Sequence, residues 1–164
     1  MPESVLQAVR DASIEYEGAG MSVLEMSHRS RPIVELFDSA TSSVRELLDV
    51  PSNYHVLWLQ GGASLQFSMI PLNLLPENGS ADYLDTGAWS SKAIIECNRV
   101  GVANVIGSSK ESTYTYIPRG YKQNIGSEYL HITSNNTIYG TQFNVFSEVS
   151  RGHGPLIADM SSDI

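Results

Sequence analysis

The sequence predicts an α/β fold with a mostly parallel sheet and helices on both faces of that sheet. Two observations support this prediction. Segments with apolar residues at helical spacing alternate along the chain with short apolar runs that are typical of strands. This alternating order characterises parallel sheets, whose connecting helices cover the strands. The second observation is size, because 164 residues with 41% hydrophobic content can bury one sizeable core.

Four segments predict helices. The first follows Pro2, a residue that suits the first turn of a helix, and ends before Gly18. The second is closed by Pro51, since proline cannot continue a helix. The predicted helices after the first one span residues 33–48, 64–74 and 90–99.

Short apolar runs predict the strands. One strand is expected at residues 55–60, directly before the glycine pair Gly61 and Gly62. The loop before the second helix carries His28 and Arg29. The remaining strands are expected near Tyr83 and at residues 102–106, 114–117, 129–132 and 156–159.

Candidate ligand-binding residues follow four of the predicted strands. Ligands of open α/β sheets gather beyond the carboxyl ends of the strands. Segments 61–64, 87–89 and 135–137 each follow a strand, and Asp159 ends another. The free N–H groups at the start of the helix after Gly62 can hold a phosphate, although a Gly-Gly turn taken alone is more often a simple chain reversal. We expect these strand ends to converge on one pocket.

Two of these candidates, and Arg29 of an earlier loop, also have a purely structural interpretation. Asp159 ends an apolar strand, where a carboxylate needs a partner. It either contacts a ligand, caps a neighbouring helix, or bonds the backbone N–H groups of residues 161–162. Trp89 either stacks on a planar ligand or packs as an ordinary tryptophan. Arg29, beside His28 in a polar loop, either recognises a carboxylate at two points or is solvated.

Charge and composition exclude several classes of partner. A net charge of −8 without a cluster of Lys and Arg argues against nucleic-acid binding. No segment approaches the roughly 18 apolar residues of a membrane span. Residues 1–4 lack the start of a secretory signal and the single Cys97 cannot form an internal disulfide, so we expect a cytoplasmic protein. Cys97 itself is expected to be a buried apolar residue. No metal site is expected, because no paired spacing links the histidines, which are His28, His55, His131 and His153.

Five motifs occur in one order over nearly the whole chain. They are MSVLEMSHRS at 21–30, QGGASLQF at 60–67, TGAWSSKA at 86–93, NNTIYG at 135–140 and ADMSSDI at 158–164. In this order they resemble the phosphoserine aminotransferases, which are class V aminotransferases with fold type I of the pyridoxal phosphate enzymes. The resemblance implies a piece of an aspartate-aminotransferase-like large domain, and pyridoxal 5′-phosphate as the cofactor.

The resemblance also implies residue roles. The implied cofactor residues are Ala63, Ser64, Trp89, Thr137 and Asp159, and the implied substrate residues are Arg29 and His28. In the family, backbone amides at the first two positions meet the cofactor phosphate and the tryptophan lies over the cofactor ring. The threonine hydrogen-bonds the ring oxygen, and the aspartate pairs with the protonated pyridine nitrogen. The histidine and arginine hold the acidic group of the substrate and can serve the site of a neighbouring subunit.

The implied reaction exchanges an amino group between O-phospho-L-serine and 2-oxoglutarate, giving 3-phosphooxypyruvate and L-glutamate in L-serine biosynthesis, in a homodimer. Residues 1–164 are expected to be a fragment truncated at both ends, comprising the N-terminal segment and part of the cofactor-binding large domain. No lysine of the chain matches the Schiff-base lysine of the family. That lysine and the small domain are expected beyond Ile164, so this piece alone is expected to lack a catalytic residue and to be inactive.

Some points stay open at this stage. Some relatives carry Gly-Arg where this chain has Ala63 and Ser64, which leaves open how the substrate phosphate is held. Another fold type I pyridoxal phosphate enzyme, such as a small-acid aminotransferase or a cysteine desulfurase, is an alternative. A non-catalytic α/β module that binds a phosphorylated ligand is a second alternative.

Overall fold

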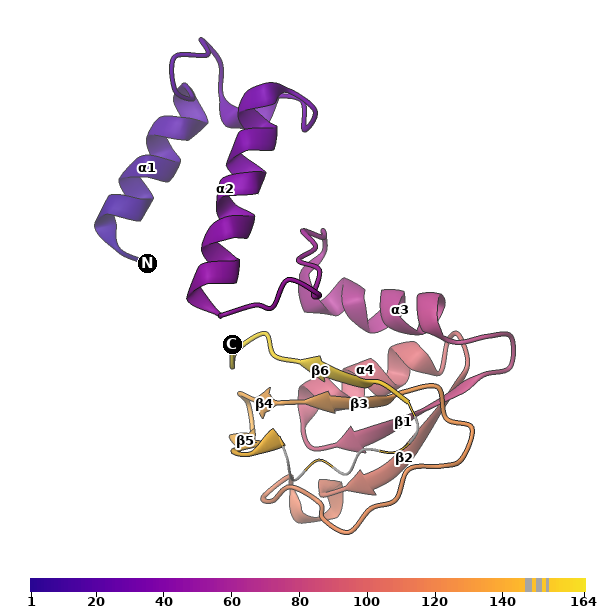
Figure 1. The fold of residues 1–164 in the computed structure, drawn as a ribbon. Helices are drawn as coiled ribbons and strands as arrows, with labels where there is room; N and C mark the ends of the chain where they lie inside the picture. The colour runs from indigo at the N-terminus through magenta and orange to yellow at the C-terminus, as the bar shows by residue number, and fades with distance from the viewer. Residues whose placement is uncertain (147–148, 150–151, 153) are drawn as a thin grey trace. The chain divides into compact units, whose positions relative to one another are not determined.

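The computed structural model describes residues 1–146, 149, 152 and 154–164 of the chain. These residues form two compact units, which we describe separately (Figure 1). Residues Met1–Trp58 make up the first, called the helical unit below, and residues Leu59–Ile164 make up the second, called the sheet unit.

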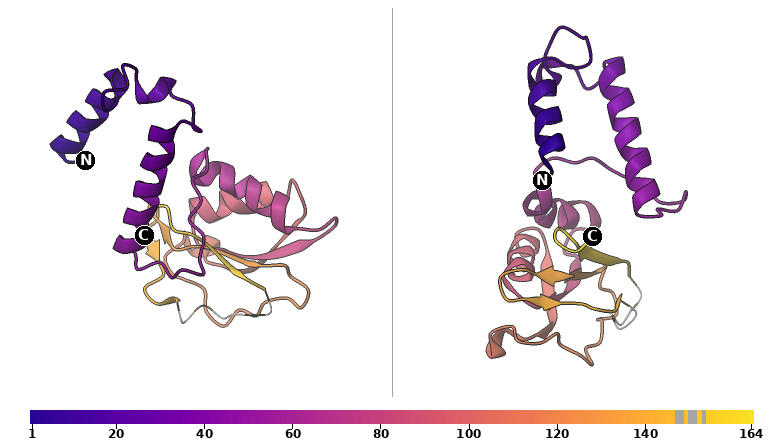
Figure 2. Two further views of the ribbon diagram at one scale, coloured as in Figure 1. Left: turned by 45° about the horizontal axis from the view of Figure 1, so that its top comes forward. Right: turned by 90° about the vertical axis from the view of Figure 1, so that its left-hand side faces the viewer.

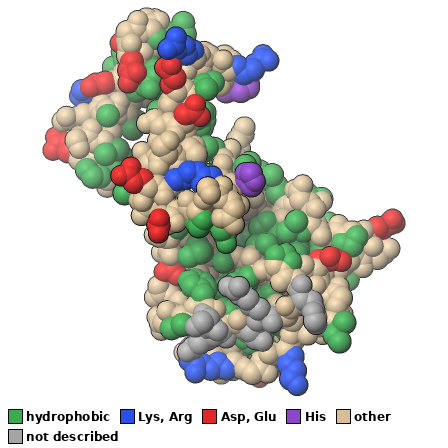
Figure 3. Space-filling model, viewed as in Figure 1, with side chains coloured by type: hydrophobic (Ala, Val, Ile, Leu, Met, Phe, Trp, Pro, Cys, Tyr) green, Lys and Arg blue, Asp and Glu red, His purple; other side chains and the backbone are tan. Residues whose placement is uncertain are grey.

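The helical unit contains two α-helices, α1 (Glu3–Ile14) and α2 (Arg31–Leu47), and a short 3-10 helix η1 (Val23–Glu25) between them. Ser22 and Glu25 cap η1 reciprocally, because the Ser22 hydroxyl accepts from the Leu24 N–H while Glu25 accepts from the Ser22 N–H. Within residues 1–58, all of which are described, Ile33 is the one buried hydrophobic side chain. Figure 3 shows acidic side chains spread over this unit beside exposed hydrophobic ones.

The strand predicted at residues 55–60 is wrong. This segment is irregular and exposed, and no strand pairs with it in the described part of the chain. Trp58 packs instead against Phe37 of α2, with ring centroids 6.3 Å apart, and its indole N–H donates to the Thr41 hydroxyl at 2.9 Å. This apolar segment therefore contacts helix α2 through Trp58 instead of pairing with a strand. The length of an apolar segment in the sequence does not distinguish these two arrangements.

The sheet unit confirms the prediction of an α/β fold with a mostly parallel sheet. Its main sheet has the strand order β2-β1-β3-β6, and every neighbouring pair in it is parallel. The strands are β1 (Ser80–Asp85), β2 (Val102–Ser108), β3 (Leu130–Thr133) and β6 (Leu156–Asp159). Their carboxyl ends therefore lie at one edge of the sheet, which is where the candidate residues follow the strands.

Two helices cover one face of this sheet. They are α3 (Gly62–Leu74) and α4 (Ala88–Cys97), which pack against each other, and Figure 2 shows them beside the sheet in two further views. Alternate strand residues such as Ala81 and Tyr83 point toward them and join Phe67 and Cys97 in one core cluster. Cys97 is fully buried, as the sequence predicted.

Irregular segments cover the opposite face of the sheet within the described part of the sheet unit. Leu84, Leu130, Ile132 and Phe143 belong to a second core cluster there, against which Ile117 and Tyr121 pack. Helices α3 and α4 both lie on the first face. The predicted α/β fold with a mostly parallel sheet and helices is confirmed.

The strand predicted at residues 114–117 is also wrong. A short 3-10 helix, η2 (Lys110–Ser112), precedes this segment. Thr113 and Tyr114 then adopt left-handed backbone conformations, with φ of 55° and 56°. A strand requires negative φ, so these two residues end any extended pairing before it starts.

A small hairpin was not predicted. Strand β4 (Asn135–Asn136) pairs antiparallel with β5 (Thr141–Gln142) directly after the end of β3. Its strands have two residues each and are polar, so neither alternation nor β propensity reveals them. Gly140 supplies the positive φ, 79°, that the turn needs. The hairpin matters because it carries Asn136 and Thr137 to the site.

Candidate functional site

A cavity of about 290 Å³ lies at the carboxyl ends of the strands of the sheet unit. It is formed by the start of α3, the start of α4, the β4–β5 hairpin and the end of β6. All of the residues expected to hold a cofactor line it, namely Ala63, Ser64, Trp89, Thr137 and Asp159. The predicted convergence on one pocket is thus found, although residues 61–64 follow an irregular segment and not a strand.

The start of α3 gives the cavity an anion-binding side. Gly61 and Gly62 have positive φ values of 81° and 56°, which turn the chain sharply into the helix. A side chain on Gly61 would also collide with Leu65, so glycine is required there for space as well. The N–H groups of the first helical turn have no partner within the helix and lie at the positive end of its dipole. An anion in the cavity can therefore accept from this turn and from the Ser64 hydroxyl.

Two hydrogen bonds hold Trp89 in place, one at its backbone and one at its indole ring. Its backbone N–H donates to Asn136 Oδ1 at 3.2 Å, and its indole N–H donates to Thr137 Oγ1 at 3.1 Å. The ammonium of Lys92, one turn along α4, lies 4.4 Å from the indole ring centroid. Because both hydrogen bonds come from the hairpin, the hairpin restricts rotation of the Trp89 side chain. A fixed indole can serve as a stacking surface for a planar ligand.

The buried carboxylate of Asp85 organises the start of α4. Asp85, at the end of β1, accepts from the hydroxyls of Ser90 and Ser91 at 3.2 and 2.8 Å, and from those of Ser108 and Tyr114 at 3.3 Å each. Burial raises the pKa of Tyr114, which keeps its hydroxyl protonated as a donor. Sequence reasoning missed Asp85, although it ends an apolar strand just as Asp159 does.

There is no space for a side chain at Gly87. Its backbone is extended, with φ of 165°, but a Cβ there would overlap the side-chain amide of Asn136. That amide also donates to the Thr86 hydroxyl at 2.9 Å. We expect Gly87→Ala to destabilise the sheet unit by about 1–3 kcal/mol in urea unfolding, because the overlap must displace Asn136.

The control for Gly87 is the double variant. Asn136→Ala removes the side chain that the new methyl group would strike, so Gly87→Ala in that background is expected to cost little more than Asn136→Ala alone. If the two substitutions instead lowered the free energy of unfolding additively, the overlap with Asn136 would not be the cause of the destabilisation in Gly87→Ala.

Asp159 lies half-buried at the cavity. Its Oδ1 accepts from the backbone N–H of Ser161 at 3.2 Å and from the Ser161 hydroxyl at 2.5 Å. The structural interpretation of Asp159 is therefore confirmed for Ser161, whereas Ser162 instead bonds the Asn135 carbonyl. Within the described residues, both hydrogen bonds to this carboxylate end on Oδ1, which leaves Oδ2 for a ligand.

Two further polar residues behind the cavity were missed by sequence reasoning. His131 and Thr133 are each 1% exposed, and no described group hydrogen-bonds the His131 ring nitrogens or the Thr133 hydroxyl. Burial lowers the pKa of His131 to about 4, against an opposing effect of Asp159. His131 was considered only as a metal ligand, and its place in an apolar strand gave no other signal.

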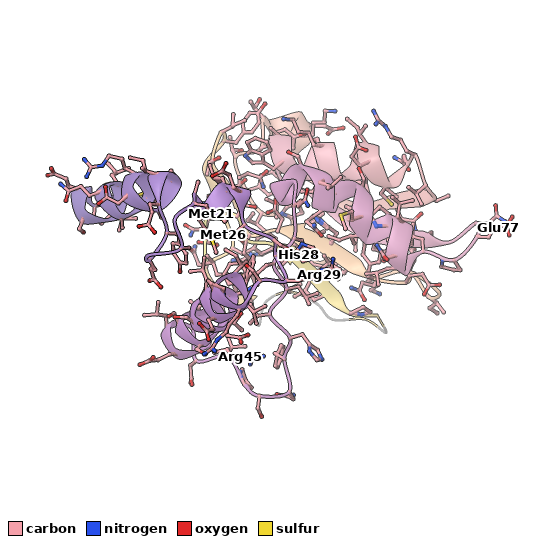
Figure 4. The ribbon with its side chains drawn as sticks, turned by 90° about the horizontal axis from the view of Figure 1, so that it is seen from above. Met21, Met26, His28, Arg29, Arg45 and Glu77 are labelled. Carbon is pink, nitrogen blue, oxygen red and sulfur yellow. The ribbon has the colours of Figure 1, made fainter. Side chains whose placement is uncertain are left out.

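The expected substrate residues belong to the helical unit. His28 and Arg29 are exposed neighbours on the loop before α2, as Figure 4 shows. Ser27 shapes this loop, since its hydroxyl accepts from the Arg29 N–H at 3.3 Å and its carbonyl accepts from the Ser30 hydroxyl at 2.7 Å. Every residue that lines the cavity described above belongs to the sheet unit.

Among the described residues, no group of His, Cys, Asp and Glu could hold a metal ion; His153, which the sequence analysis considered, lies outside them. No helix in the described ranges is long and apolar enough to cross a membrane.

Comparison with known proteins identifies the family. The model of the family described as aminotransferase class-V matches residues 1–163. The chain belongs to the class V aminotransferases. This confirms the family resemblance that the five motifs carried.

The class V relatives are similar over the whole chain. The phosphoserine aminotransferase of Halalkalibacterium halodurans is 48% identical over 166 residues, which cover 100% of this chain and 45% of the relative. The structure of phosphoserine aminotransferase from Bacillus circulans subsp. alkalophilus matches with a TM-score of 0.90 at 42% identity, over 100% of this chain and 45% of that one.

A third class V match concerns the cofactor. The structure of phosphoserine aminotransferase from Trichomonas vaginalis, described as bound to PLP, matches with a TM-score of 0.86 at 35% identity over 100% of this chain and 46% of that chain. The present chain thus spans less than half the length of the class V aminotransferases it matches.

Proposed function

We propose that this chain is part of a phosphoserine aminotransferase and that its cavity holds pyridoxal 5′-phosphate. The observation that carries the proposal is the convergence of Ala63, Ser64, Trp89, Thr137 and Asp159 on one cavity. The complete enzyme would exchange an amino group between O-phospho-L-serine and 2-oxoglutarate, giving 3-phosphooxypyruvate and L-glutamate in L-serine biosynthesis. The similarity to proteins named phosphoserine aminotransferase supports this substrate class.

The residues present fit the chemical groups of this cofactor. The start of α3 and the Ser64 hydroxyl offer donors to its phosphate, and Trp89 offers a flat apolar surface to its ring. The Thr137 hydroxyl already accepts the Trp89 indole N–H, so its own proton remains to be donated to the ring oxygen. Asp159 offers Oδ2 to the ring nitrogen while Ser161 holds Oδ1.

Each of these residues then has a defined task. When bound, the cofactor supplies an electron sink for the substrate carbon. Asp159 keeps the ring nitrogen protonated, because an ionised carboxylate favours a cationic partner beside it. Trp89 and the hairpin orient the ring, and the start of α3 anchors the phosphate without needing a charged side chain. We place the lysine that moves the substrate proton, and the small domain, outside residues 1–164.

We also propose that His28 and Arg29 hold the acidic group of the substrate, in a homodimer. A guanidinium suits two-point recognition of an anion, and both side chains are exposed. Exposed apolar side chains on the two helices of the helical unit support a further contact surface, and they include Val5, Val9, Ile14, Leu36 and Phe37. We propose a cytoplasmic location, with which the buried free thiol of Cys97 is compatible.

Binding of pyridoxamine 5′-phosphate tests the cofactor site. This amine form of the cofactor lacks the aldehyde, so it cannot react with exposed lysines. We expect saturable binding to the chain, measured by calorimetry, and at least about tenfold weaker binding of pyridoxamine, since removal of the phosphate removes the charge-assisted bonds to α3. Equal affinity for the two compounds would contradict the assigned phosphate position.

Substrate assays on the complete enzyme test the reaction. O-phospho-L-serine is expected to be the preferred amino donor over L-serine and L-alanine, with 2-oxoglutarate as acceptor. A complete enzyme that prefers an unphosphorylated donor would contradict the proposed substrate, while leaving the cofactor site intact.

A further inference from the structure

Two buried polar residues of β3 share a sheet face with Asp159. In the parallel pairing of β3 with β6, Thr133 lies opposite Asp159 and His131 lies opposite Ile157. Side chains alternate between the two faces of a sheet, so His131, Thr133 and Asp159 project to the same face. This is the face that α3 and α4 cover, beside the cavity.

Within the part of the chain that the structure describes, these two residues have none of the hydrogen-bond partners that buried polar groups normally have. No described group hydrogen-bonds Nδ1 or Nε2 of His131, or Oγ1 of Thr133, although each side chain is only 1% exposed. Nearly all buried polar groups in folded proteins are hydrogen-bonded, so three unpaired atoms on one face call for an explanation. An apolar residue of similar size at either position would remove this cost to stability.

The surroundings of His131 keep it neutral. Its ring stacks on Tyr83, with centroids 4.9 Å apart, and meets the edge of Phe67, which lines the cavity, at 6.4 Å. Burial lowers its pKa to about 4, and the opposing effect comes from the Asp159 carboxylate. A neutral imidazole can donate a hydrogen bond without neutralising that carboxylate, whereas an imidazolium would compete with a cationic ligand for it.

We propose that His131 and Thr133 are positioning residues that support Asp159 from beneath the cavity. Their polar side chains lie on the same sheet face as the carboxylate and orient it electrostatically, so that its Oδ2 faces the ligand. In naming the ligand, this inference rests on the proposed function. The two residues act through Asp159 and do not themselves contact the cofactor. The absence of a hydrogen-bond partner among the described residues is a stability cost that comes with this role.

Three variants test the proposal by affinity and stability together. His131→Leu removes the polar atoms at nearly constant volume, His131→Gln keeps an amide, and Thr133→Val removes only the hydroxyl. Measured on the chain without ligand, the melting temperature of His131→Leu and of Thr133→Val is expected to be unchanged or higher. The Kd for pyridoxamine 5′-phosphate is expected to rise about tenfold in His131→Leu, as is common when support of a binding group is removed. His131→Gln is expected to recover most of that loss.

Tyr129→Phe is the matched control. The Tyr129 hydroxyl is buried in the same core, but it has partners, hydrogen-bonding the Tyr83 hydroxyl at 2.8 Å and donating to Cys97 Sγ. Its removal is therefore expected to lower the melting temperature and to leave the Kd unchanged, the reverse of the pattern for His131→Leu.

Several outcomes would overturn the inference. Wild-type affinity in both His131→Leu and Thr133→Val would do so, as would equal weakening by His131→Leu and His131→Gln, which would point to packing rather than polarity. If the wild-type chain itself did not bind pyridoxamine 5′-phosphate, the proposed function would fail together with this inference. Binding by wild type with no effect of the variants would overturn the inference alone.

Discussion

Replacement of Asp159 by asparagine is expected to lower the turnover of the complete enzyme by at least about a hundredfold, while the fold stays intact. Asparagine has the same shape and keeps an oxygen for the Ser161 N–H, so the hydrogen bond that ends β6 survives. The amide has no charge, however, and cannot hold the ring nitrogen in its protonated form. Steady-state kinetics measures the loss, and circular dichroism checks the fold.

Ser161→Ala is the control for this prediction. It removes the hydroxyl that bonds Asp159 Oδ1 but keeps the carboxylate and the backbone N–H contact. We expect a far smaller loss of turnover than in Asp159→Asn, because the charge remains. Wild-type turnover in Asp159→Asn would refute the assignment of Asp159 to the cofactor.

Acid is expected to destabilise the wild-type sheet unit more than the His131→Leu variant. The pKa of His131 falls from 6.5 to about 4 on folding because the ring is buried. Between these values the unfolded chain binds a proton that the folded chain does not, so stability falls as pH falls. The full effect is about 3 kcal/mol, reached near pH 4, and it is absent above about pH 7.

Urea unfolding at pH 7, 5.5 and 4.5 measures this effect. The difference in the free energy of unfolding between wild type and His131→Leu isolates the histidine, since the carboxylates are common to both chains. The difference is expected to grow in favour of the variant as the pH falls. Parallel dependence on pH in the two proteins would show that His131 is not buried in its neutral form.

Much of the fold followed from local patterns in the sequence. Helices α1 to α4 have apolar residues at helical spacing, and β1, β2, β3 and β6 are apolar runs that find parallel neighbours. Asp159 stood out because a carboxylate ends an apolar run, and Trp89 because a large aromatic residue follows a glycine turn. Parallel strands bring their carboxyl ends together, so chain order alone placed these residues in one cavity.

What the sequence did not reveal depends on contacts between distant segments. The run at residues 55–60 resembles a strand, but Trp58 packs on Phe37. The run at residues 114–117 fails because Thr113 and Tyr114 adopt positive φ, which their side chains do not predict. Asn136 was predicted only as part of segment 135–137, and its contacts with Gly87 and Trp89 appeared when the hairpin placed it there. His131 was considered only as a metal ligand, and the packed core alone shows that no described group hydrogen-bonds its ring nitrogens.

The distribution of indole side chains has a practical consequence. The two tryptophans of the chain are divided between the units, with Trp58 in the helical unit and Trp89 in the sheet unit. Each indole N–H donates to a threonine of its own unit, so each chromophore has a distinct local environment. In a Trp58→Phe background, fluorescence would therefore report occupancy of the cavity and unfolding of the sheet unit without any added label.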